Sequence, residues 1–517
     1  MFDIIIKGAQ VIDGTGSPAF RADVAMKDGR LTVLPGGSEG LTAQTVIDAH
    51  SHGDLVLGRD YAHLCKTSQG ITTEIAGQCG NSEFPTSTDP YLYQRHVDDV
   101  PKVGELGHDV TDTFAQYRAY MERTPKTAHI KQFVGHGPLR RAVMGTENRA
   151  PTRSELDNMK AMLREAMESG AMGMTTGLIY PPGGFSKQDE LTELCKVVAE
   201  YNGVYATHMR EEGDFVVESV REAIETARDA GCRLDISHHK ICSHKNWGKS
   251  KETLALIDAA NAAGQEVAFD VYPYTASMTS LSACLPLTEF VYPREERVAR
   301  LRAPATRALI RGQMERGEVL KFSQLSGFDK ILLVYFNKTP QFCGKTIAQV
   351  AEELDIDPYD VFFDILADNN YIGSSCFFTM CDDDLCRIFC HERAMLGTDG
   401  LVYAMDTPTH PRGFCSFPHA IDFFVKQKKL LTLESAIRKM TGFTADWLSV
   451  KNKGYVKDGY DADLVIFDCD AITGGFTYAQ SVRPNPGIES VFVDGQIVYQ
   501  DSALTGKTPG RFLPHRI

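Results

Sequence analysis

The sequence predicts an α/β protein in which a (β/α)8 TIM-like barrel carries a small β-sandwich domain formed from both termini. Three observations lead to this fold class. In the middle of the chain, short apolar strands alternate with amphipathic helices, which is typical of βαβ units and a parallel sheet. Both ends are instead rich in β-branched strands, and 517 residues suffice for a barrel of this kind. We expect the sandwich to comprise residues 1–45 and 445–517, and the barrel residues 46–444.

The terminal segments have the pattern of short strands broken by turns. The stretch FDIIIKGAQVIDG precedes ADVAMKDGRLTVL, with Asp-Gly turns at Asp13-Gly14 and Asp28-Gly29. The same pattern returns near the C-terminus in residues 454–468 and 488–501. Because two strand-rich ends flank a different middle, we expect them to assemble into one small domain.

A capping box marks the first clear helix of the middle region. Thr152 and Glu155 have the required spacing, apolar residues then recur at helical intervals, and Gly170 ends the pattern. Residues 276–390 show no clear period, and barrel strands with an inserted lid would both fit there. The other elements that we predict are helices over 186–203 and 215–230, and strands over 173–178, 204–208, 233–238 and around Asp270.

Composition excludes several classes of partner. The chain is 43% hydrophobic and 24% charged, as ordinary globular proteins are, and its net charge of -14 argues against nucleic acid or an anionic membrane. A small-molecule substrate is therefore expected. The start MFDIIIKGAQ lacks the features of a signal peptide, and the thirteen cysteines form no regular framework. We expect a cytoplasmic protein; the oligomeric state stays open.

Candidate metal ligands recur at the ends of the predicted strands. The stretch VIDAHSHGDLVL places His50 and His52 one residue apart, where strand alternation would direct both imidazoles to one point. Singly, each candidate has a simpler reading as a hydrogen-bonded histidine, a buried cysteine or a turn aspartate. Their shared position favours a joint site for one or two metal ions. The other candidates of this kind are Cys79, His208, His238 and Asp399.

Polar residues near these candidates suit an anionic substrate. By strand alternation His238 and Lys240 share a face, whereas His239 points away and is interpreted as structural. Lys240 is then a cation at the mouth of the site, unless it is a solvated lysine at a strand end. Tyr274 in VYPYTA and Arg412 in HPRGF are further candidates, because arginine grips a carboxylate at two points.

An ordered series of motifs also resembles a known family. The series is GHGPLRRAVMG, TGLIYPPGGF, VYATHMREEGD, ISHHK, DVYPYTA, GTDG, HPRGF, SAIRKMTGFTADWLSV, GYDADLVIFD and TGKTPGR. Together these stretches are similar to the N-acyl-D-amino-acid deacylases, or D-aminoacylases, of the metal-dependent amidohydrolase superfamily, over nearly the whole chain. The resemblance implies a barrel with a small β-sandwich and zinc-dependent hydrolysis of the amide of N-acyl-D-amino acids.

The resemblance also implies roles for single residues. Metal-bound hydroxide would attack the amide carbonyl, with Asp399 as general base and then general acid. Tyr272 is the alternative to Tyr274, since the match does not fix which tyrosine contacts the substrate. The implied sets are Cys79, His208 and His238 for a tight zinc; His50, His52 and Asp399 for a second, weaker site; and Lys240, Tyr274 and Arg412 for the substrate carboxylate or carbonyl.

One departure from the family pattern leaves alternatives open. The run TAQTVIDAHSH reaches the histidines about a dozen residues early, which puts the second metal site in doubt. Another amidohydrolase reaction would use the same barrel, either hydrolysis of D-dipeptides or opening of cyclic amides, the latter with a carboxylated lysine for which only Lys131 is a candidate. A catalytically impaired relative or a non-catalytic binding protein is the remaining alternative.

Overall fold

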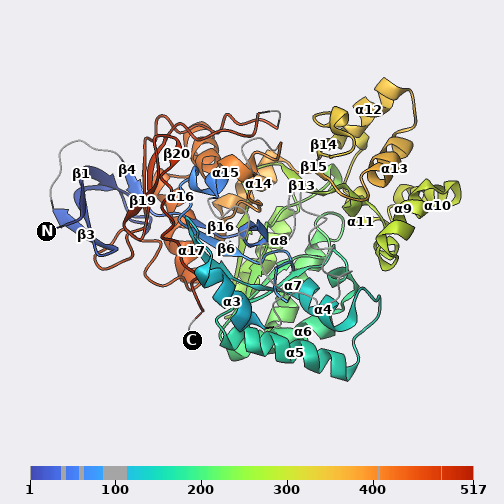
Figure 1. Cartoon of the computed structure of the whole chain (residues 1–517), viewed down its shortest axis with the longest axis horizontal. Coiled ribbons are helices and arrows are strands. Elements are labelled where there is room, and N and C mark those ends of the chain that lie inside the picture. The colour runs from blue at the N-terminus through green and yellow to red at the C-terminus, as the bar shows by residue number, and fades with distance from the viewer. Residues whose placement is uncertain are drawn as a thin grey trace.

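The computed structural model describes residues 2–35, 42–56, 63–85, 113–403, 408–478 and 480–515. Figure 1 shows a central barrel, a strand-rich region at one end that combines both termini, and a third region at the other end. The parallel strands are β5 (Ile47–Asp48), β6 (Thr73–Ala76), β7 (His129–Gln132), β8 (Val134–Gly135), β9 (Gly173–Gly177), β10 (Val204–His208), β11 (Arg233–Ile236), β12 (Val267–Val271) and β16 (Ala394–Leu396).

Backbone hydrogen bonds close these strands into a barrel. One run is β5-β6-β7 and the other is β8-β9-β10-β11-β12-β16, and only Phe133 separates β7 from β8. Between the first and last strands, Ala49 N donates to Leu396 O at 3.1 Å and Asp399 N donates to His50 O at 2.8 Å. The predicted (β/α)8 fold is therefore confirmed.

Helices pack around the barrel and bury its outer face. Leu163, Val220 and Ile257, from three different helices, are almost inaccessible and share one core with strand residues such as Ile236. The predicted capping box is present, since Thr152 accepts from Glu155 N and Glu155 from Thr152 N. The helices are α1 (Leu64–Thr67), α3 (Phe114–Arg123), α4 (His136–Met144), α5 (Arg153–Glu168), α6 (Gln188–Glu200), α7 (Val216–Ala230), α8 (Ser250–Ala262), α14 (Asp382–Cys390), α15 (Arg412–Ala420), α16 (Leu433–Met440) and α17 (Gly442–Trp447).

The start of α6 differs from the prediction. The helix begins at Gln188 with no side-chain cap, and Ser186 instead donates its hydroxyl to Gly183 O at 2.6 Å. A local turn therefore uses the hydroxyl that the sequence pattern assigned to the helix.

Strands from both termini form one eight-stranded sheet. Its order is β20-β19-β18-β17-β4-β1-β2-β3, so β4 lies between a strand from each end of the chain. The predicted turn at Asp28-Gly29 joins β2 to β3, with positive φ at both residues. The strands are β1 (Ile4–Val11), β2 (Phe20–Lys27), β3 (Arg30–Pro35), β4 (Thr42–Gln44), β17 (Leu464–Phe467), β18 (Ile488–Val493), β19 (Gln496–Gln500) and β20 (Ala503–Leu504).

Residues 276–378 form a separate unit, here called the insert, at the opposite end from the terminal sheet (Figure 1). Three antiparallel strands in the order β13-β15-β14 and a group of helices enclose a core of their own. The elements are β13 (Ala276–Ser280), α9 (Arg294–Arg302), α10 (Pro304–Glu315), α11 (Leu320–Ser323), β14 (Ile331–Tyr335), α12 (Ile347–Leu354), α13 (Pro358–Asp368) and β15 (Ser374–Phe378).

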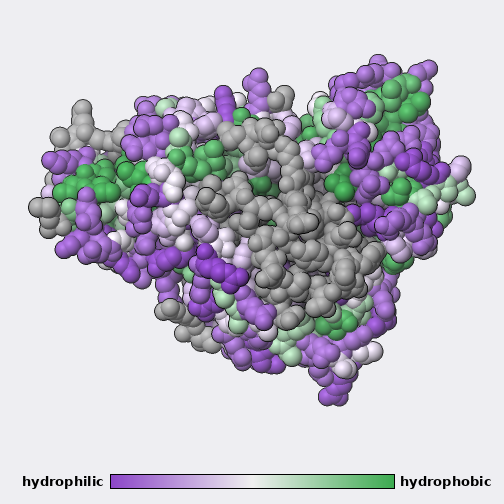
Figure 2. All heavy atoms as spheres, in the orientation of Figure 1, coloured by the Kyte–Doolittle hydropathy of each residue, from purple (hydrophilic) through white to green (hydrophobic). Residues whose placement is uncertain are grey.

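The surface seen in Figure 2 is largely hydrophilic, with hydrophobic side chains gathered over the terminal sheet and over the insert. Exposed apolar residues of these regions include Ile5 and Phe20 in the sheet, and Leu354 and Ile356 near the end of α12. None of the described helices is long and apolar enough to cross a membrane.

Candidate metal centre and cavity

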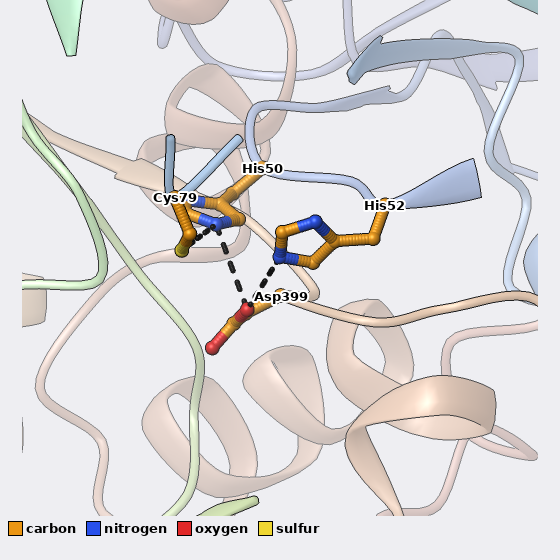
Figure 3. Close-up of side chains that lie close together, drawn as sticks. All are labelled: His50, His52, Cys79 and Asp399. Carbon is orange, nitrogen blue, oxygen red and sulfur yellow. Dashed lines mark hydrogen bonds and ion pairs between the residues drawn. The ribbon is translucent and has the colours of Figure 1, made fainter. Parts of the chain in front are cut away.

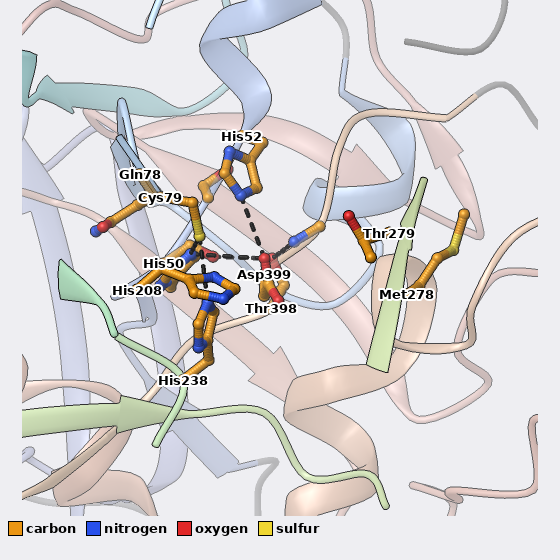
Figure 4. A network of polar contacts seen from close by, with 12 residues as sticks. His50, His52, Gln78, Cys79, His208, His238, Met278, Thr279, Thr398 and Asp399 are labelled. Atoms are coloured by element: carbon orange, nitrogen blue, oxygen red, sulfur yellow. Dashed lines mark hydrogen bonds and ion pairs between the residues drawn. The ribbon is translucent and has the colours of Figure 1, made fainter. Parts of the chain in front are cut away.

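The six predicted metal ligands converge at the carboxyl end of the barrel. The ligand atoms of His50, His52, Cys79 and Asp399 all lie within 4.8 Å of one another (Figure 3). Those of Cys79, His208 and His238 meet the same limit, and Figure 4 shows both groups together. Cys79 belongs to both groups, so it occupies the position between two potential metal sites.

An unusual backbone conformation directs three of these side chains inward. Cys79, His238 and Asp399 each follow the end of a strand by two or three residues, and their φ angles are +53°, +38° and +48°. Residues other than glycine rarely adopt positive φ, and such strain concentrates at functional sites. The site therefore depends on turns at the strand ends and not on the strands alone.

A glycine lets the Cys79 turn approach the neighbouring strand. A Cβ on Gly177, the last residue of β9, would lie 2.1 Å from the carbonyl oxygen of Cys79. No side chain fits in that space, so glycine is required where the two backbones touch.

The two histidines of the HSH stretch converge for a reason other than the predicted one. Strand β5 ends at Asp48, so His50 and His52 lie beyond the strand and strand alternation does not position them. Their ring centroids are nonetheless 5.4 Å apart, and both rings point toward Asp399 (Figure 3). The short run into this stretch, which raised doubt about the second group, leads through β4 and β5 directly to it.

The group of Cys79, His208 and His238 is deeply buried. Cys79 Sγ lies 3.2 Å from His238 Nε2, and the His208 and His238 ring centroids are 4.4 Å apart. Both ring nitrogens of His208 are buried without a hydrogen-bond partner. Burial raises the pKa of the Cys79 thiol and lowers the pKa of His208. A bound cation would supply the partner that these atoms lack.

The second group is surrounded by charged partners. His50 Nδ1 lies 2.9 Å from Asp270 Oδ2, which leaves Nε2 directed at Cys79 and Asp399. His52 Nε2 is 3.2 Å from Asp399 Oδ1, and Arg412 donates to Asp399 Oδ2 at 2.7 Å. Burial alone would raise the pKa of Asp399, but Arg412 and the neighbouring histidines hold it well below its ordinary value. Asp399 is therefore ionised.

Glu212 is a site residue that the sequence did not reveal. Its Oε1 accepts from Lys240 Nζ at 2.5 Å and lies 3.3 Å from His238 Nδ1. Lys240 Nζ also lies 2.6 Å from His238 Nδ1. The stretch HMREEGD places Glu212 four residues after His208, and that spacing was the available signal. Its carboxylate is placed to orient His238, a candidate ligand, as hydrogen bonds behind metal ligands commonly do.

His239 points away from the site, as predicted, although β11 ends at Ile236 and strand alternation is not the cause. Its Nε2 lies 3.0 Å from Thr253 Oγ1 in α8, and its ring packs on Phe269.

A second buried network joins the two loops that carry His50 and Asp399. Asp48 accepts from Thr398 N at 2.8 Å and from His50 N at 3.2 Å, and Lys66 donates to Asp48 Oδ2 at 2.9 Å. Lys66 also donates to Ser51 Oγ and to Thr398 Oγ1. Since all of these groups are inaccessible to solvent, each depends on the others for its charge or hydrogen bonds.

A cavity of about 280 Å³ opens above the ligands, and its walls come from the barrel and the insert. Tyr272 lines it, with the Arg412 guanidinium 4.8 Å and the Lys240 ammonium 5.5 Å from its ring centroid. Tyr274, the predicted residue, instead stacks on His419 at 4.6 Å and is not among the lining residues. The geometry therefore favours the alternative, Tyr272, as the tyrosine at the substrate.

Lys131, the residue required by a carboxylated-lysine alternative, has contacts elsewhere. It donates to Ser449 O at 2.9 Å, and burial together with Arg233 and Lys451 lowers its pKa to about 7. It is not among the described residues that line the cavity above the candidate ligands.

The donor set fits zinc. One thiol, four imidazoles and one carboxylate are ligand types that zinc accepts, and the orphaned nitrogens of His208 point to a missing partner.

Comparison with known proteins adds three findings. Residues 388–498 match the model of the amidohydrolase family. Three proteins of Alcaligenes xylosoxydans xylosoxydans align over 99% of this chain: D-aminoacylase (32% identical, 97% of its length covered), N-acyl-D-aspartate deacylase (33%, 95%) and N-acyl-D-glutamate deacylase (32%, 96%). The crystal structure of N-acyl-D-glutamate deacylase from Bordetella bronchiseptica, complexed with zinc and a phosphonate mimic of the tetrahedral intermediate, superposes with a TM-score of 0.83 at 31% identity over 99% of both chains.

Proposed function

The chain belongs to the N-acyl-D-amino-acid deacylases of the amidohydrolase family, and we propose that the six converging ligands and the cavity above them hydrolyse N-acyl-D-amino acids to a carboxylate and a free D-amino acid. The observation that carries the proposal is the convergence of these ligands beside two cations that suit a carboxylate, Lys240 and Arg412.

Zinc is the proposed metal. Cys79, His208 and His238 would hold the tight ion, and His50, His52 and Asp399 would line a second, weaker position that shares Cys79. When bound, zinc lowers the pKa of a coordinated water and polarises the amide carbonyl. Glu212 and Asp270 keep the ring nitrogens of His238 and His50 in place for this role.

Asp399 is the proposed general base and acid. Its carboxylate is ionised and lies between the two histidines and Arg412, at the edge of the cavity. It accepts the proton of the attacking water and then delivers that proton to the amine leaving group, which must be protonated to depart. One carboxylate thus serves both halves of the reaction.

Lys240, Tyr272 and Arg412 are the proposed anchors of the substrate α-carboxylate. Arg412 uses one N–H on Asp399 and another on Met278 O, which leaves three of its five donors for a ligand. With the α-carboxylate fixed at this side and the amide at the ligand cluster, the side chains of the two enantiomers point into different parts of the cavity. Preference for the D-form follows where the cavity walls accept only one of these two directions.

The test combines metal content with stereospecific turnover. We expect release of free amino acid from N-acetyl-D-methionine and not from N-acetyl-L-methionine, and we expect a chelator to abolish it. Asp399→Ala should retain the tight metal and lose turnover. Turnover of the L-form, or metal-independent turnover, would overturn the proposal.

We also propose a cytoplasmic location. All thirteen cysteines are free, and most are buried, as is usual where thiols stay reduced.

A further inference from the structure

The cavity is strongly basic although the chain is acidic. The chain has a net charge of -14, yet the described residues lining the cavity include only two acids, Glu212 and Asp399. Each already pairs with a cation of the catalytic group, Lys240 and Arg412 respectively. Six basic side chains line the same space: Arg141, Lys240, Arg294, Arg297, Lys321 and Arg412.

Lys321, from α11 of the insert, has no acidic partner among the residues that the structure describes. It is only 5% exposed, and its Nζ lies 3.3 Å from Ser277 Oγ and 3.3 Å from Gln324 Oε1, both neutral. Gln324 in turn donates to Glu211, which does not line the cavity. A buried ammonium with two long neutral contacts is costly unless an anion joins it.

Arg297, from α9, is a second cation of the same kind. Its side chain is 4% exposed and packs against two rings, 4.8 Å from the centroid of Tyr371 and 5.1 Å from that of Phe290. Its Nε is buried without a hydrogen-bond partner, and no ion pair joins its guanidinium to a described acid. The two rings contact each other, with centroids 6.4 Å apart, and together hold the guanidinium while its buried Nε stays available to a ligand.

Strand β13 connects Lys321 to the proposed α-carboxylate site, and Arg297 lines the same cavity. Lys321 contacts the side chain of Ser277, and the next residue, Met278, accepts a hydrogen bond from Arg412 NH2 at 3.0 Å. Consecutive Cα atoms are about 3.8 Å apart, so Lys321 and Arg412 contact β13 at neighbouring residues. A substrate of amino-acid size held by Arg412 therefore has a second cationic group within its reach.

We propose that Lys321 and Arg297 bind a second carboxylate of the substrate, so that the preferred N-acyl-D-amino acids carry one more negative charge than the α-carboxylate supplies. This inference rests on the proposed function. The charge has two possible sources, the side chain of an acidic D-amino acid or a dicarboxylic acyl group. Sequence identity does not indicate which substrates this chain prefers. The D-aminoacylase, the N-acyl-D-aspartate deacylase and the N-acyl-D-glutamate deacylase are all 32–33% identical to it.

Two matched substrate pairs separate these sources. N-acetyl-D-glutamate and N-acetyl-D-glutamine differ in the charge of the side chain, and N-succinyl-D-leucine and N-succinamoyl-D-leucine differ in that of the acyl group. In wild-type protein loaded with zinc, we expect kcat/KM to favour the anion roughly 10- to 100-fold in one pair, the effect of a charge-assisted hydrogen bond. The pair that responds identifies the source.

Variants test the two cations. Lys321→Met and Arg297→Met should each reduce that preference by roughly tenfold or more, while the neutral substrate of the pair changes by less than about threefold. Lys321→Arg should retain it, because the charge remains. Lys330→Met removes an exposed lysine of the same insert and should change nothing.

Distinct outcomes overturn distinct claims. Efficient turnover of N-acetyl-D-methionine without preference for the anion in either pair would overturn this inference alone, and so would an unchanged preference in both methionine variants. Absence of turnover with every N-acyl-D-amino acid would overturn the proposed function and this inference with it. If a methionine variant does not fold, the two substrate pairs measured with the wild-type protein and with Lys321→Arg still test the inference.

Discussion

Buried charges are paired at the strand-end site, whereas two buried cations in the described part of the insert have no acidic partner. At the strand ends, acids and bases are paired with each other: Asp399 with Arg412, Glu212 with Lys240, and Asp48 with Lys66. In the described part of the insert, Lys321 and Arg297 face the cavity without such partners. Paired charges hold the candidate ligands and loops in one geometry, and two of the paired cations, Lys240 and Arg412, are also the proposed anchors of the α-carboxylate. Lys321 and Arg297 hold no acid in place, so we expect them to act in selecting the substrate and not in the chemistry.

The largest effect is expected at Cys79, the proposed ligand that both groups share. Cys79→Ala should remove the tight metal and lower turnover by more than roughly 1000-fold, because the metal supplies several kcal/mol to the reaction. Metal content per chain and turnover of N-acetyl-D-methionine measure this. Cys195→Ala changes another buried cysteine, in α6; it is the control and should keep both the metal and the turnover. A metal-replete Cys79→Ala protein would contradict the ligand assignment.

The sequence predicted the barrel because its strand and helix signals are local. The capping box at Thr152 and the apolar spacing after it depend on neighbouring residues only, and the structure contains both. The ligand types were readable for a similar reason. A histidine, cysteine or aspartate that follows a short strand lies at the carboxyl end of a barrel wherever the strand itself is correctly assigned.

What the sequence did not reveal depends on distant contacts. Left-handed φ at Cys79 and His238 is imposed by packing and has no local signature in these residue types. Only the folded chain shows that Tyr272 faces the cavity while Tyr274 stacks on His419. In the insert, β13 pairs with β15 across nearly a hundred residues, so periodicity within 276–390 gave no clear assignment.

Removing one member of a paired set should cost stability. Lys66→Met leaves Asp48 without its cation in a fully buried site, and we expect a loss of about 3–5 kcal/mol in the free energy of unfolding. Urea denaturation measures it. Arg153→Ala, which removes a fully exposed partner of Asp157, should change stability by less than about 0.5 kcal/mol. If Lys66→Met lowers the free energy of unfolding by no more than Arg153→Ala does, the Lys66–Asp48 ion pair does not stabilise the fold.

An unpaired cation buried in the barrel should show the opposite behaviour. Burial lowers the pKa of Lys131 to about 7, below its value in the unfolded chain. Between pH 7 and about 10.5, Lys131 is protonated in the unfolded chain but largely neutral in the folded one, so the free energy of unfolding rises with pH. Below pH 7 the lysine is charged in both states, and the full cost of burying the charge lowers the stability of the folded protein. Lys131→Met should therefore stabilise the protein by roughly 2–4 kcal/mol at pH 6.

The pH dependence separates this cause from better packing. The gain from Lys131→Met should shrink steadily as the pH is raised from 7 to 10, measured by urea denaturation at each pH. A gain that is constant with pH would assign the effect to the added apolar side chain and not to the charge.

The smallest effect compares one motif in both regions. The insert has its own capping box, in which Thr346 accepts from Gln349 N at the start of α12, as Thr152 does in α5 of the barrel. Thr346→Ala and Thr152→Ala should each lower the free energy of unfolding by about 1 kcal/mol.

Because the core of the insert is separate from that of the barrel, Thr346→Ala should speed hydrogen exchange roughly fivefold at amides of the insert and leave barrel amides unchanged. Thr152→Ala should act on the barrel amides. Equal acceleration in both regions by either variant would mean that the insert opens only together with the barrel, and that the cavity wall carrying Lys321 is as rigid as the metal site itself.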